Sequence, residues 1–246
     1  MRRTLIALAL TSLAATSHAA SPQINVGPMF EYMPAGSSQY LKRVRNSGDA
    51  TAYVRVEITR MNFDSAGKIS ETPVDAAALA RNQTDASGLI ASPSRMIIPA
   101  NNGMQATRLI FRGQRDSEQY YRVRYVPVVP ESGEFSLDEQ QSEDYKRGMS
   151  AGVNVFTGFG TVVFVPPSNA RYETRVEGGQ VSNHGNATVV LDNVKTCQLA
   201  KPDQCVKGNK VHLRPGQSSA LPADAAVYNR FDVIEGGNKR SVDSRR

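Results

Sequence analysis

Short runs in which apolar and polar residues alternate are the feature that most restricts the fold of this chain. Residues 120–129 read YYRVRYVPVV, and residues 41–61 and 95–112 each contain two further runs joined by a turn sequence. The turns are Asn-Ser-Gly-Asp in the first case and Pro-Ala-Asn-Asn-Gly in the second. Because successive side chains of a strand point to opposite faces, this pattern predicts half-buried strands joined as hairpins. Several short strands at this spacing predict an all-β sandwich.

A second set of strand patterns follows two consecutive prolines at 166 and 167. The runs are at 171–178, 180–182, 187–195, 210–215 and 226–234. The sequences NSGDATAYVRV at Asn46 and NHGNATVVLDN at Asn183 also share a pattern, as two related sandwiches would. We therefore predict two sandwich domains and a polar tail that is frayed. Their ranges are 21–166, 168–236 and 237–246.

Two segments interrupt the strand pattern. Residues 74–81, VDAAALAR, fit either a short helix or an insert without regular structure. Residues 130–148, PESGEFSLDEQQSEDYKRG, are polar and acidic and have no apolar face. A segment of this kind has little reason to pack on a core, so we expect a long mobile loop there.

The first residues carry a targeting signal. Arg2 and Arg3 precede an apolar run that ends at Thr16 and is too short to span a bilayer. Ser17-His18-Ala19 then supplies small residues at the positions that a signal peptidase reads. We predict a signal peptide at 1–19, cleaved after Ala19 or Ala20, and export to a bacterial periplasm. No later segment is apolar over a sufficient length to cross a membrane, so we expect no membrane insertion.

Charge and cysteine content limit the partners and the kinds of site that this chain can have. The formal net charge is +6, but the basic residues are scattered and form no stripe with interleaved aromatic residues, so we expect no nucleic-acid partner. The two cysteines, Cys197 and Cys205, lie in the exported part, where an oxidising compartment favours a disulfide. A metal site needs more ligands than His184 and His212 can add, so we predict neither a metal nor a cofactor.

A secreted hydrolase is the default enzyme for an exported chain. The zinc-protease motif His-Glu-x-x-His is absent, and His184 and His212 read as strand-end or turn residues rather than as catalytic bases. The carboxylates Asp138, Glu139, Glu143 and Asp144 cluster in the expected loop, where they keep that loop solvated. We predict no catalytic residue and no enzyme activity.

Residues 150–167, SAGVNVFTGFGTVVFVPP, raise a question that the fold does not answer. This segment carries no charge and is rich in residues that favour strands. An exposed segment of this composition tends to aggregate, so something must cover it.

The order of these features resembles periplasmic pilus-assembly chaperones of the chaperone–usher pathway. The resemblance is closest to the alternate branch that serves colonization-factor and cable-type pili, and it covers nearly the whole exported chain. It rests on four segments: TRLIF at 107–111 after SPSRMIIPANNG, YYRVRYVPVVPE at 120–131, GVNVFTGFGTVVFVPP at 152–167, and NVKTCQLAKPDQCVKG at 193–208.

The resemblance implies two immunoglobulin-like β-sandwiches set at an angle, with a cleft between them that holds one pilus subunit. The subunit is a sandwich that lacks its last strand, and the chaperone lends a strand of its own to the open groove. An outer-membrane usher is the second partner that it implies. A structural pilin or adhesin of a surface fibre is the alternative.

The segment at 152–167 is then the lent strand, and its alternation divides it into two faces. We expect Val153, Val155, Thr157 and Phe159 on one face, with Val153 and Val155 filling the pockets of the subunit. Phe156, on the other face, is the second choice. We expect Val162 to Val165 to pack in the core of the chaperone itself.

One family feature is missing. The better-known branch holds the subunit's C-terminal carboxylate with an Arg on the first strand and a Lys on the lent strand. Here the first strand reads NVGPMFEYMP, without a basic residue, and Thr161 stands near the position of the Lys. Arg108, Arg122 and Arg171 are the candidates that could replace this pair.

Overall fold

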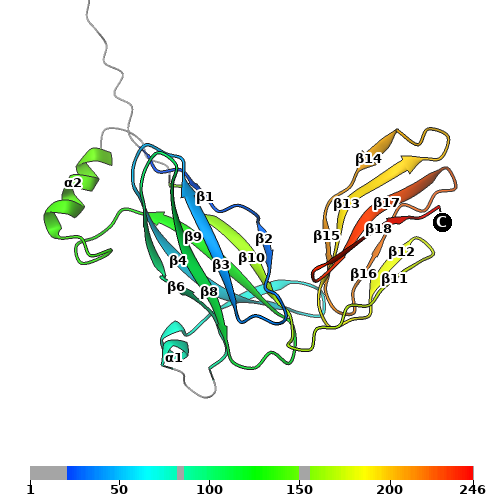
Figure 1. The fold of residues 1–246 in the computed structure, drawn as a ribbon, viewed down its shortest axis with the longest axis horizontal. Helices are drawn as coiled ribbons and strands as arrows, with labels where there is room; N and C mark the ends of the chain where they lie inside the picture. Colours follow the sequence, from blue (N-terminus) through cyan, green and yellow to red (C-terminus); the bar gives the residue numbers. More distant parts are fainter. Residues whose placement is uncertain (1–20, 82–85, 150–155, 246) are drawn as a thin grey trace, which may run out of the picture.

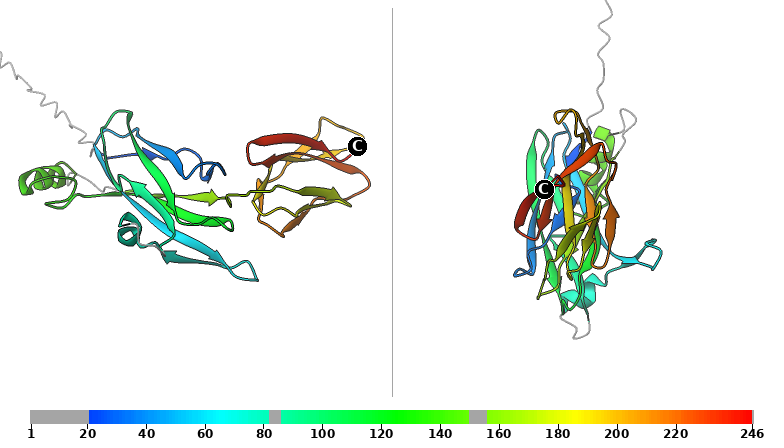
Figure 2. Two further views of the ribbon diagram at one scale, coloured as in Figure 1. Left: turned by 60° about the horizontal axis from the view of Figure 1, so that its bottom comes forward. Right: turned by 90° about the vertical axis from the view of Figure 1, so that its right-hand side faces the viewer.

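The protein consists of two β-sandwiches joined end to end, so that the molecule bends at their junction (Figures 1 and 2). The structure is a computed structural model that describes residues 21–81, 86–149 and 156–245. The predicted signal peptide and the two predicted pocket-filling residues, Val153 and Val155, lie outside these residues. The all-β fold predicted from the alternating runs is confirmed.

The first sandwich is built from a four-stranded and a six-stranded sheet. The first sheet has the order β1 (Ile24–Asn25), β3 (Gln39–Asn46), β8 (Gly103–Arg112) and β6 (Gly88–Ser92). The second has the order β2 (Phe30–Tyr32), β10 (Phe159–Val165), β9 (Gln119–Val128), β4 (Ala52–Phe63) and β5 (Ile69–Pro73), with β7 (Arg95–Ile98) paired to β4. Alternate residues of β9, namely Tyr121, Val123 and Tyr125, are fully buried between the sheets.

The second sandwich is smaller and has its own core. One sheet has the order β11 (Thr174–Glu177), β12 (Gln180–Asn183) and β16 (Ser218–Ala220). The other has the order β14 (Cys205–Lys207), β13 (Val189–Gln198), β17 (Val227–Glu235) and β18 (Asn238–Asp243), with β15 (Val211–Leu213) paired to β13. Val181, Leu191, Phe231 and Val233 lie at the centre of this core.

The shared pattern at Asn46 and Asn183 forms the same structure twice. Each asparagine is buried, and its side-chain amide donates to two or three carbonyl oxygens, among them Ala50 O and Ala187 O. Each side-chain oxygen accepts from the glycine two residues on, Gly48 or Gly185. A Cβ atom on either glycine would lie 2.2 Å from a carbonyl oxygen, so only glycine fits. Two related sandwiches explain the repeat.

The expectation of a frayed tail is wrong for residues 238–243. These residues form β18, which pairs with β17 along its whole length. Val242 packs against the second core opposite Phe231, and Ser241 and Lys239 both bind the carboxylate of Asp232. One apolar contact and side-chain pairing to the neighbouring strand therefore hold a segment whose composition alone predicts disorder.

The expectation of a loop throughout 130–148 is also wrong, because α2 (Glu139–Met149) lies there. Asp138 and Gln141 cap its start reciprocally: the N–H of Gln141 donates to Asp138 Oδ1 at 2.7 Å, and the N–H of Asp138 donates to Gln141 Oε1 at 3.0 Å. The hydroxyl of Tyr145 donates to the carbonyl oxygen of Thr51, and its ring meets that of Tyr53 edge-on. This helix lies at the end of the first sandwich that is remote from the second (Figure 1). The other segment that interrupts the strand pattern, residues 74–81, contains the short helix α1 (Ala76–Ala80). A short helix is one of the two structures predicted for it.

Polar and aromatic contacts fix the junction between the sandwiches. Thr188 of the second sandwich donates from its N–H and its hydroxyl to the carboxylate of Glu118, at 2.9 and 2.6 Å. His212 of β15 lies against three aromatic rings of the first sandwich, those of Phe30, Tyr32 and Phe164. The two domains therefore meet through defined side chains and not only through the chain that connects them.

Candidate functional site

The candidate site is the part of β10 that only one neighbouring strand covers. β9 pairs antiparallel with all seven residues of β10, whereas β2 pairs parallel with Val162, Val163 and Phe164 alone. The N–H of Val162 donates to Met29 O at 2.8 Å, and Phe164 O accepts from the N–H of Met33 at 2.9 Å. Within the described ranges, no strand pairs with Phe159–Thr161 on the β2 side. An open edge of this kind can accept a strand from another chain.

The two faces of β10 have different surroundings. Thr161, Val163 and Val165 are fully buried in the first sandwich, and Phe159 packs against the same core. On the opposite face Phe164 is also buried, because the rings of Tyr32, Tyr120 and His212 cover it. The expectation that the end of this segment packs within the protein is therefore confirmed for Val163, Phe164 and Val165.

The predicted subunit-binding residues that are described lie at the start of this edge. Thr157 is exposed, Phe156 is half-buried, and both precede β10 directly. By alternation Thr157 shares the inward face of Phe159, and Phe156 shares the outward face of Gly158 and Gly160. Val153 and Val155 come before these residues and lie outside the described part of the chain.

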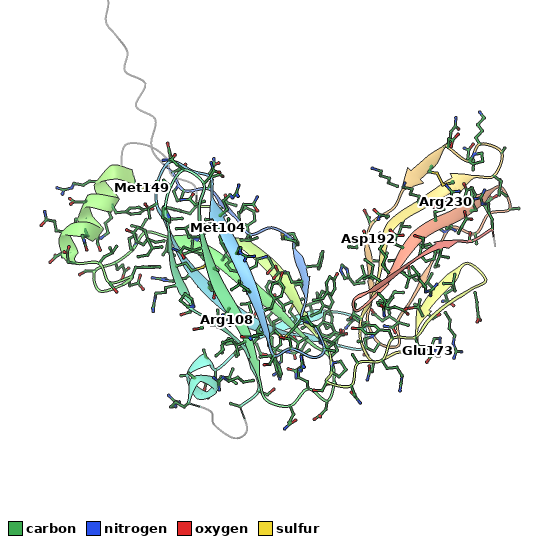
Figure 3. The ribbon with its side chains drawn as sticks, in the orientation of Figure 1. Met104, Arg108, Met149, Glu173, Asp192 and Arg230 are labelled. Atoms are coloured by element: carbon green, nitrogen blue, oxygen red, sulfur yellow. A yellow bond between two sulfur atoms is a disulfide. The ribbon has the colours of Figure 1, made fainter. Side chains whose placement is uncertain are left out.

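The three candidate arginines do not come together. Arg108 is exposed on β8, which belongs to the sheet that does not contain β10 (Figure 3). Arg171 is exposed past the domain junction, where its N–H donates to Asn186 Oδ1. Arg122 lies on β9 directly opposite Val162, so of the three it alone lies on a strand that pairs with β10.

Arg122 belongs to a charged cluster on the outer face of the six-stranded sheet. Its Nε lies 2.8 Å from Glu71 Oε1, and Arg124 Nη2 lies 2.7 Å from Glu71 Oε2. Burial raises the pKa of Glu71, but the hydrogen bonds from Thr59, Arg124 and Arg122 outweigh it and lower the pKa to about 2. A Cβ atom on Gly160 would lie 3.5 Å from Arg122 Cδ, an ordinary van der Waals contact, so the side chain of this arginine lies over Gly160 of β10.

An aromatic corner closes the junction end of this face. The corner consists of Phe30, Tyr32, Tyr120, Phe164 and His212. The hydroxyl of Tyr32 lies 2.6 Å from His212 Nε2, and the ring of Phe164 stacks on the imidazole at 5.2 Å. Burial lowers the pKa of His212 to about 4, and the positive charge of Lys210 adds to this effect. His212 lies inside β15, so its expected place at a strand end or turn is wrong. No local signal in the sequence indicates its aromatic partners, because they come from β2 and β10.

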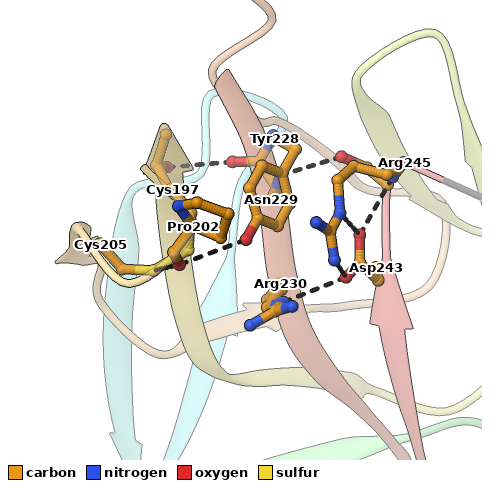
Figure 4. The surroundings of a disulfide bond; sticks show 10 residues. Cys197, Pro202, Cys205, Tyr228, Asn229, Arg230, Asp243 and Arg245 are labelled. Atoms are coloured by element: carbon orange, nitrogen blue, oxygen red, sulfur yellow. Dashed lines mark hydrogen bonds and ion pairs between the residues drawn. A yellow bond between two sulfur atoms is a disulfide. The ribbon is translucent and has the colours of Figure 1, made fainter. Parts of the chain in front are cut away.

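The disulfide predicted between Cys197 and Cys205 is present. The two residues are direct partners on β13 and β14, with Cα atoms 4.0 Å apart (Figure 4). Pro202 and Tyr228 lie beside it, at an end of the second sandwich away from the aromatic corner. The disulfide therefore staples a hairpin and takes no part in the candidate site.

Three further findings concern a metal site, a membrane-spanning helix and a hydrolase motif. In the described ranges, no group of three or more His, Cys, Asp or Glu side chains is placed to hold a metal ion. None of the described helices has the length and apolar character of a membrane-spanning segment. Residues 148–152, GMSAG, match the hydrolase pattern Gly-x-Ser-x-Gly, but Gly148 and Met149 are the last two residues of helix α2, whereas a nucleophile elbow begins at the end of a strand.

Comparison with known proteins shows that this chain is similar to one group of proteins, the fimbrial chaperones. No family model matches. The probable fimbrial chaperone EcpB of Klebsiella pneumoniae strain 342 is 24% identical over 98% of this chain and 93% of its own length. EcpB of Escherichia coli O7:K1 is 26% identical over 89% of this chain and 88% of its own.

Solved structures share the fold. The class 5 fimbriae chaperone CfaA matches with a TM-score of 0.54 and 18% identity, over 90% of this chain and 99% of its own. The CupB2 chaperone of Pseudomonas aeruginosa also has a TM-score of 0.54, with 14% identity, over 89% of this chain and 98% of its own. Both the sequence and the fold of this chain are thus similar to those of such chaperones along most of its length.

Proposed function

We propose that this chain, which is similar to fimbrial chaperones in sequence and in fold, is such a chaperone and binds pilus subunits along the open edge of β10. The family resemblance drawn from the four sequence segments is confirmed. The chaperone holds one subunit in a soluble one-to-one complex and delivers it to an outer-membrane usher. It makes and breaks no covalent bond, in keeping with relatives that are chaperones and not enzymes.

The limited reach of β2 is the observation that carries this proposal. Since β2 stops covering β10 before Val162, the main-chain N–H and C=O groups at Gly158 and Gly160 are available to a strand of the subunit. β9 holds the other edge of β10 in place, so the lent strand is preorganised for binding. The apolar segment at 150–167 is covered when a subunit accepts it.

Side chains before β10 supply the specificity of the lent strand. We assign Val153, Val155, Thr157 and Phe159 to the face that enters the subunit, because this face continues the inward face of Thr161 and Val163. Phe156 remains the second choice, on the outward face. In this arrangement the core of the subunit continues the core of the first sandwich.

Arg122 is the candidate anchor for the subunit's C-terminal carboxylate. It lies on the strand next to β10 with its side chain over Gly160, and it already binds one carboxylate, that of Glu71, in the geometry that favours arginine. Arg108 and Arg171 have no such position. A subunit carboxylate would share or replace the contact with Glu71.

The export signal and the domain limits belong to the same proposal. Cleavage after Ala20 would create an α-amino group at Ser21, whose nitrogen lies 2.7 Å from Asp49 Oδ1. That ion pair would tie down the new terminus of a periplasmic protein. The separate cores support a first domain at 21–166 and a second that begins at 168 and includes β18, so that it ends past 236. Intact mass of the exported protein measures the cleavage position directly.

The alternative function, a structural pilin or adhesin, is not favoured. The matched relatives are chaperones over most of their own length. Self-polymerisation of the purified protein into fibres would support the alternative, and a stable soluble chaperone that binds a different chain would oppose it.

Co-purification tests the proposal. The tagged protein is expressed in the periplasm with the major subunit of a pilus encoded beside it, and wild type is compared with Val153→Asp/Val155→Asp. Charges forced into apolar pockets cost several kcal/mol each, roughly enough to abolish a micromolar complex. Asn154→Asp is the matched control, because alternation turns its charge away from the same pockets.

The expected result is a one-to-one complex with wild type and with Asn154→Asp, and none with the folded double variant. Equal binding by the double variant would overturn the assigned face. If wild type binds no subunit, the chaperone function itself is contradicted.

A further inference from the structure

A buried ion pair crosses the first sandwich beneath the open edge. Glu31 of β2 and Lys42 of β3 belong to different sheets, and their side chains form a salt bridge between the sheets. Both residues are almost fully buried, at 3% and 2% exposure. Lys42 Nζ also lies 3.5 Å from Pro28 O, in the segment that leads into β2.

Unpaired buried polar atoms occur within this pair and on β9 and β10 of the same sheet. Among the described residues, Glu31 Oε2, the hydroxyl of Tyr125 and the hydroxyl of Thr161 are buried and have no hydrogen-bond partner. Burial raises the pKa of Glu31, against the opposing effect of Lys42. A buried ion pair contributes little to stability compared with an apolar pair of similar volume, and its best-attested role is to fix register.

The apolar pattern of β2 does not fix its register on β10. The strand and its neighbours read Met29-Phe30-Glu31-Tyr32-Met33, apolar or aromatic everywhere except at Glu31. If β2 moved two residues toward the start of β10, Met33 would take the inward place of Glu31 opposite Val163. The move is about 7 Å and keeps every side chain on its present face.

That movement would close the candidate site. Phe30, now opposite Val162, would lie opposite Gly160, and β2 would occupy the edge that a subunit needs. Glu31 would leave Lys42 behind, because β3 is held in register by pairing with β8 along all eight of its residues. A buried lysine without its partner opposes the shift, and so does the loss of the contacts that Phe30 and Tyr32 make with His212.

We propose that the Glu31–Lys42 pair fixes the register of β2 and so keeps the edge of β10 open at Gly158 and Gly160. The two residues are positioning residues, since neither reaches the edge itself. The inference about register stands on the structure of the free protein, and its consequence for subunit binding rests on the function proposed above.

Amide hydrogen exchange at Gly160, measured by NMR, reports on the edge directly. The N–H of Val162 points toward β2, so the N–H groups of Gly160 and Gly158 point to the same side. In wild type we expect Val162, which is bonded to Met29 O, to exchange slowly and Gly160 to exchange rapidly. Destabilisation speeds exchange everywhere, but a shift of β2 slows exchange at Gly160 alone, which a merely structural role of the pair would not do.

Four variants separate the possibilities. Glu31→Leu/Lys42→Met removes the pair and keeps the volume, and Glu31→Gln/Lys42→Gln does so with hydrogen-bonding groups in case the first fails to fold. Glu31→Lys/Lys42→Glu restores the pair with reversed charges. Thr161→Val removes a polar group of the same cluster and leaves the pair intact, so it is the matched control.

We expect exchange at Gly160 to slow by about tenfold or more in the neutral variants and to remain fast in the reversed pair and in Thr161→Val. Unchanged exchange at Gly160 in a folded neutral variant, or slow exchange in a folded reversed pair, overturns the inference.

Subunit co-purification with the neutral variants separates this inference from the proposed function. Weaker binding together with slow exchange at Gly160 supports both. If the subunit binds a neutral variant as well as wild type although exchange at Gly160 is slow, the open edge is not the binding site. The role of the pair in fixing the register of β2 is then still supported. Lost binding with fast exchange overturns the role of the pair.

Discussion

The backbone N–H of Val162 lies 2.8 Å from the carbonyl oxygen of Met29, and with this bond the cover of β10 by β2 begins. Before it, β10 has a neighbour on one side only within the described residues; after it, β10 is an interior strand. One continuous strand thus serves two purposes. Its end, from Val163 to Val165, is part of the protein's own core, and its start is free to complete another chain.

Replacement of the candidate anchors one at a time should rank them. We expect Arg122→Ala to weaken the subunit complex by about 10- to 100-fold, because a hydrogen bond to a charged group contributes about 1.5–3 kcal/mol. Arg108→Ala and Arg171→Ala should leave the dissociation constant within about twofold of wild type, as exposed residues away from the edge. Titration calorimetry with a subunit peptide ending in a free carboxylate measures each. An amidated peptide is the control, and equal affinity for both peptides would contradict a carboxylate anchor.

His212 should make the stability of the junction depend on pH. Its folded pKa, about 4, lies below its ordinary value, so the unfolded chain binds this proton more readily than the folded one. The contribution of neutral His212 to the stability of the folded state is therefore complete above about pH 6.5. It is lost as the pH falls toward 4. Allowing for the partial exposure of the ring, the loss is about 1–2 kcal/mol.

Thermal unfolding between pH 7 and pH 4 measures this effect. We expect the melting temperature of His212→Gln to fall less with acid than that of wild type, whereas His184→Gln, at an exposed position, should follow wild type. Identical pH profiles for wild type and His212→Gln would show that the contact with Tyr32 and Phe164 does not depend on the neutral imidazole.

Removal of the disulfide should weaken the second sandwich only. Cys197→Ala/Cys205→Ala opens a short loop between β13 and β14, at an expected cost of about 2–3 kcal/mol. Hydrogen exchange should become faster in β13 and β17 and remain unchanged in β9 and β10, which belong to a separate core. Faster exchange in both sandwiches would mean that the two domains unfold as one unit.

The segment that contains α2 should be held on the first sandwich by a few contacts with the start of β4 and the residue before it. Tyr145→Ala removes the hydrogen bond to Thr51 O and the edge-on contact with Tyr53, so we expect faster proteolysis within 131–149. The melting temperature should change by only a few degrees, because the sandwich core is untouched. Lys146→Ala, which removes the exposed pair with Glu143, is the control. Equal proteolysis of Tyr145→Ala and wild type would mean that other contacts hold the segment.

The sequence predicts the strands of this protein better than it predicts the segments and residues that depart from the strand pattern. The run at 120–129 becomes β9 with a shift of one residue, and the repeated asparagine turns mark equivalent hairpins in both sandwiches. These features are local: alternation and turn chemistry act within about ten residues. Hence the fold class, the hairpins and the disulfide were all within reach of the sequence.

The errors share a physical cause, which is that contacts with distant strands decide the outcome. Helix α2 has only a narrow buried stripe at Ser142, Tyr145 and Met149, so its polar sequence resembles a loop. Glu31 points into the core because Lys42 meets it from the other sheet. His212 is covered by three rings from two other strands, β2 and β10. None of these partners can be identified from the neighbouring sequence.

Hydrogen exchange of the wild-type protein, free and bound to its subunit, tests the central claim most directly. If a subunit strand pairs with the open edge, the amides of Gly158 and Gly160 become protected on binding, while Val162, already bonded to Met29, changes little. If the subunit binds and both glycine amides continue to exchange as in the free protein, the subunit does not use this edge, and strand donation by β10 is contradicted.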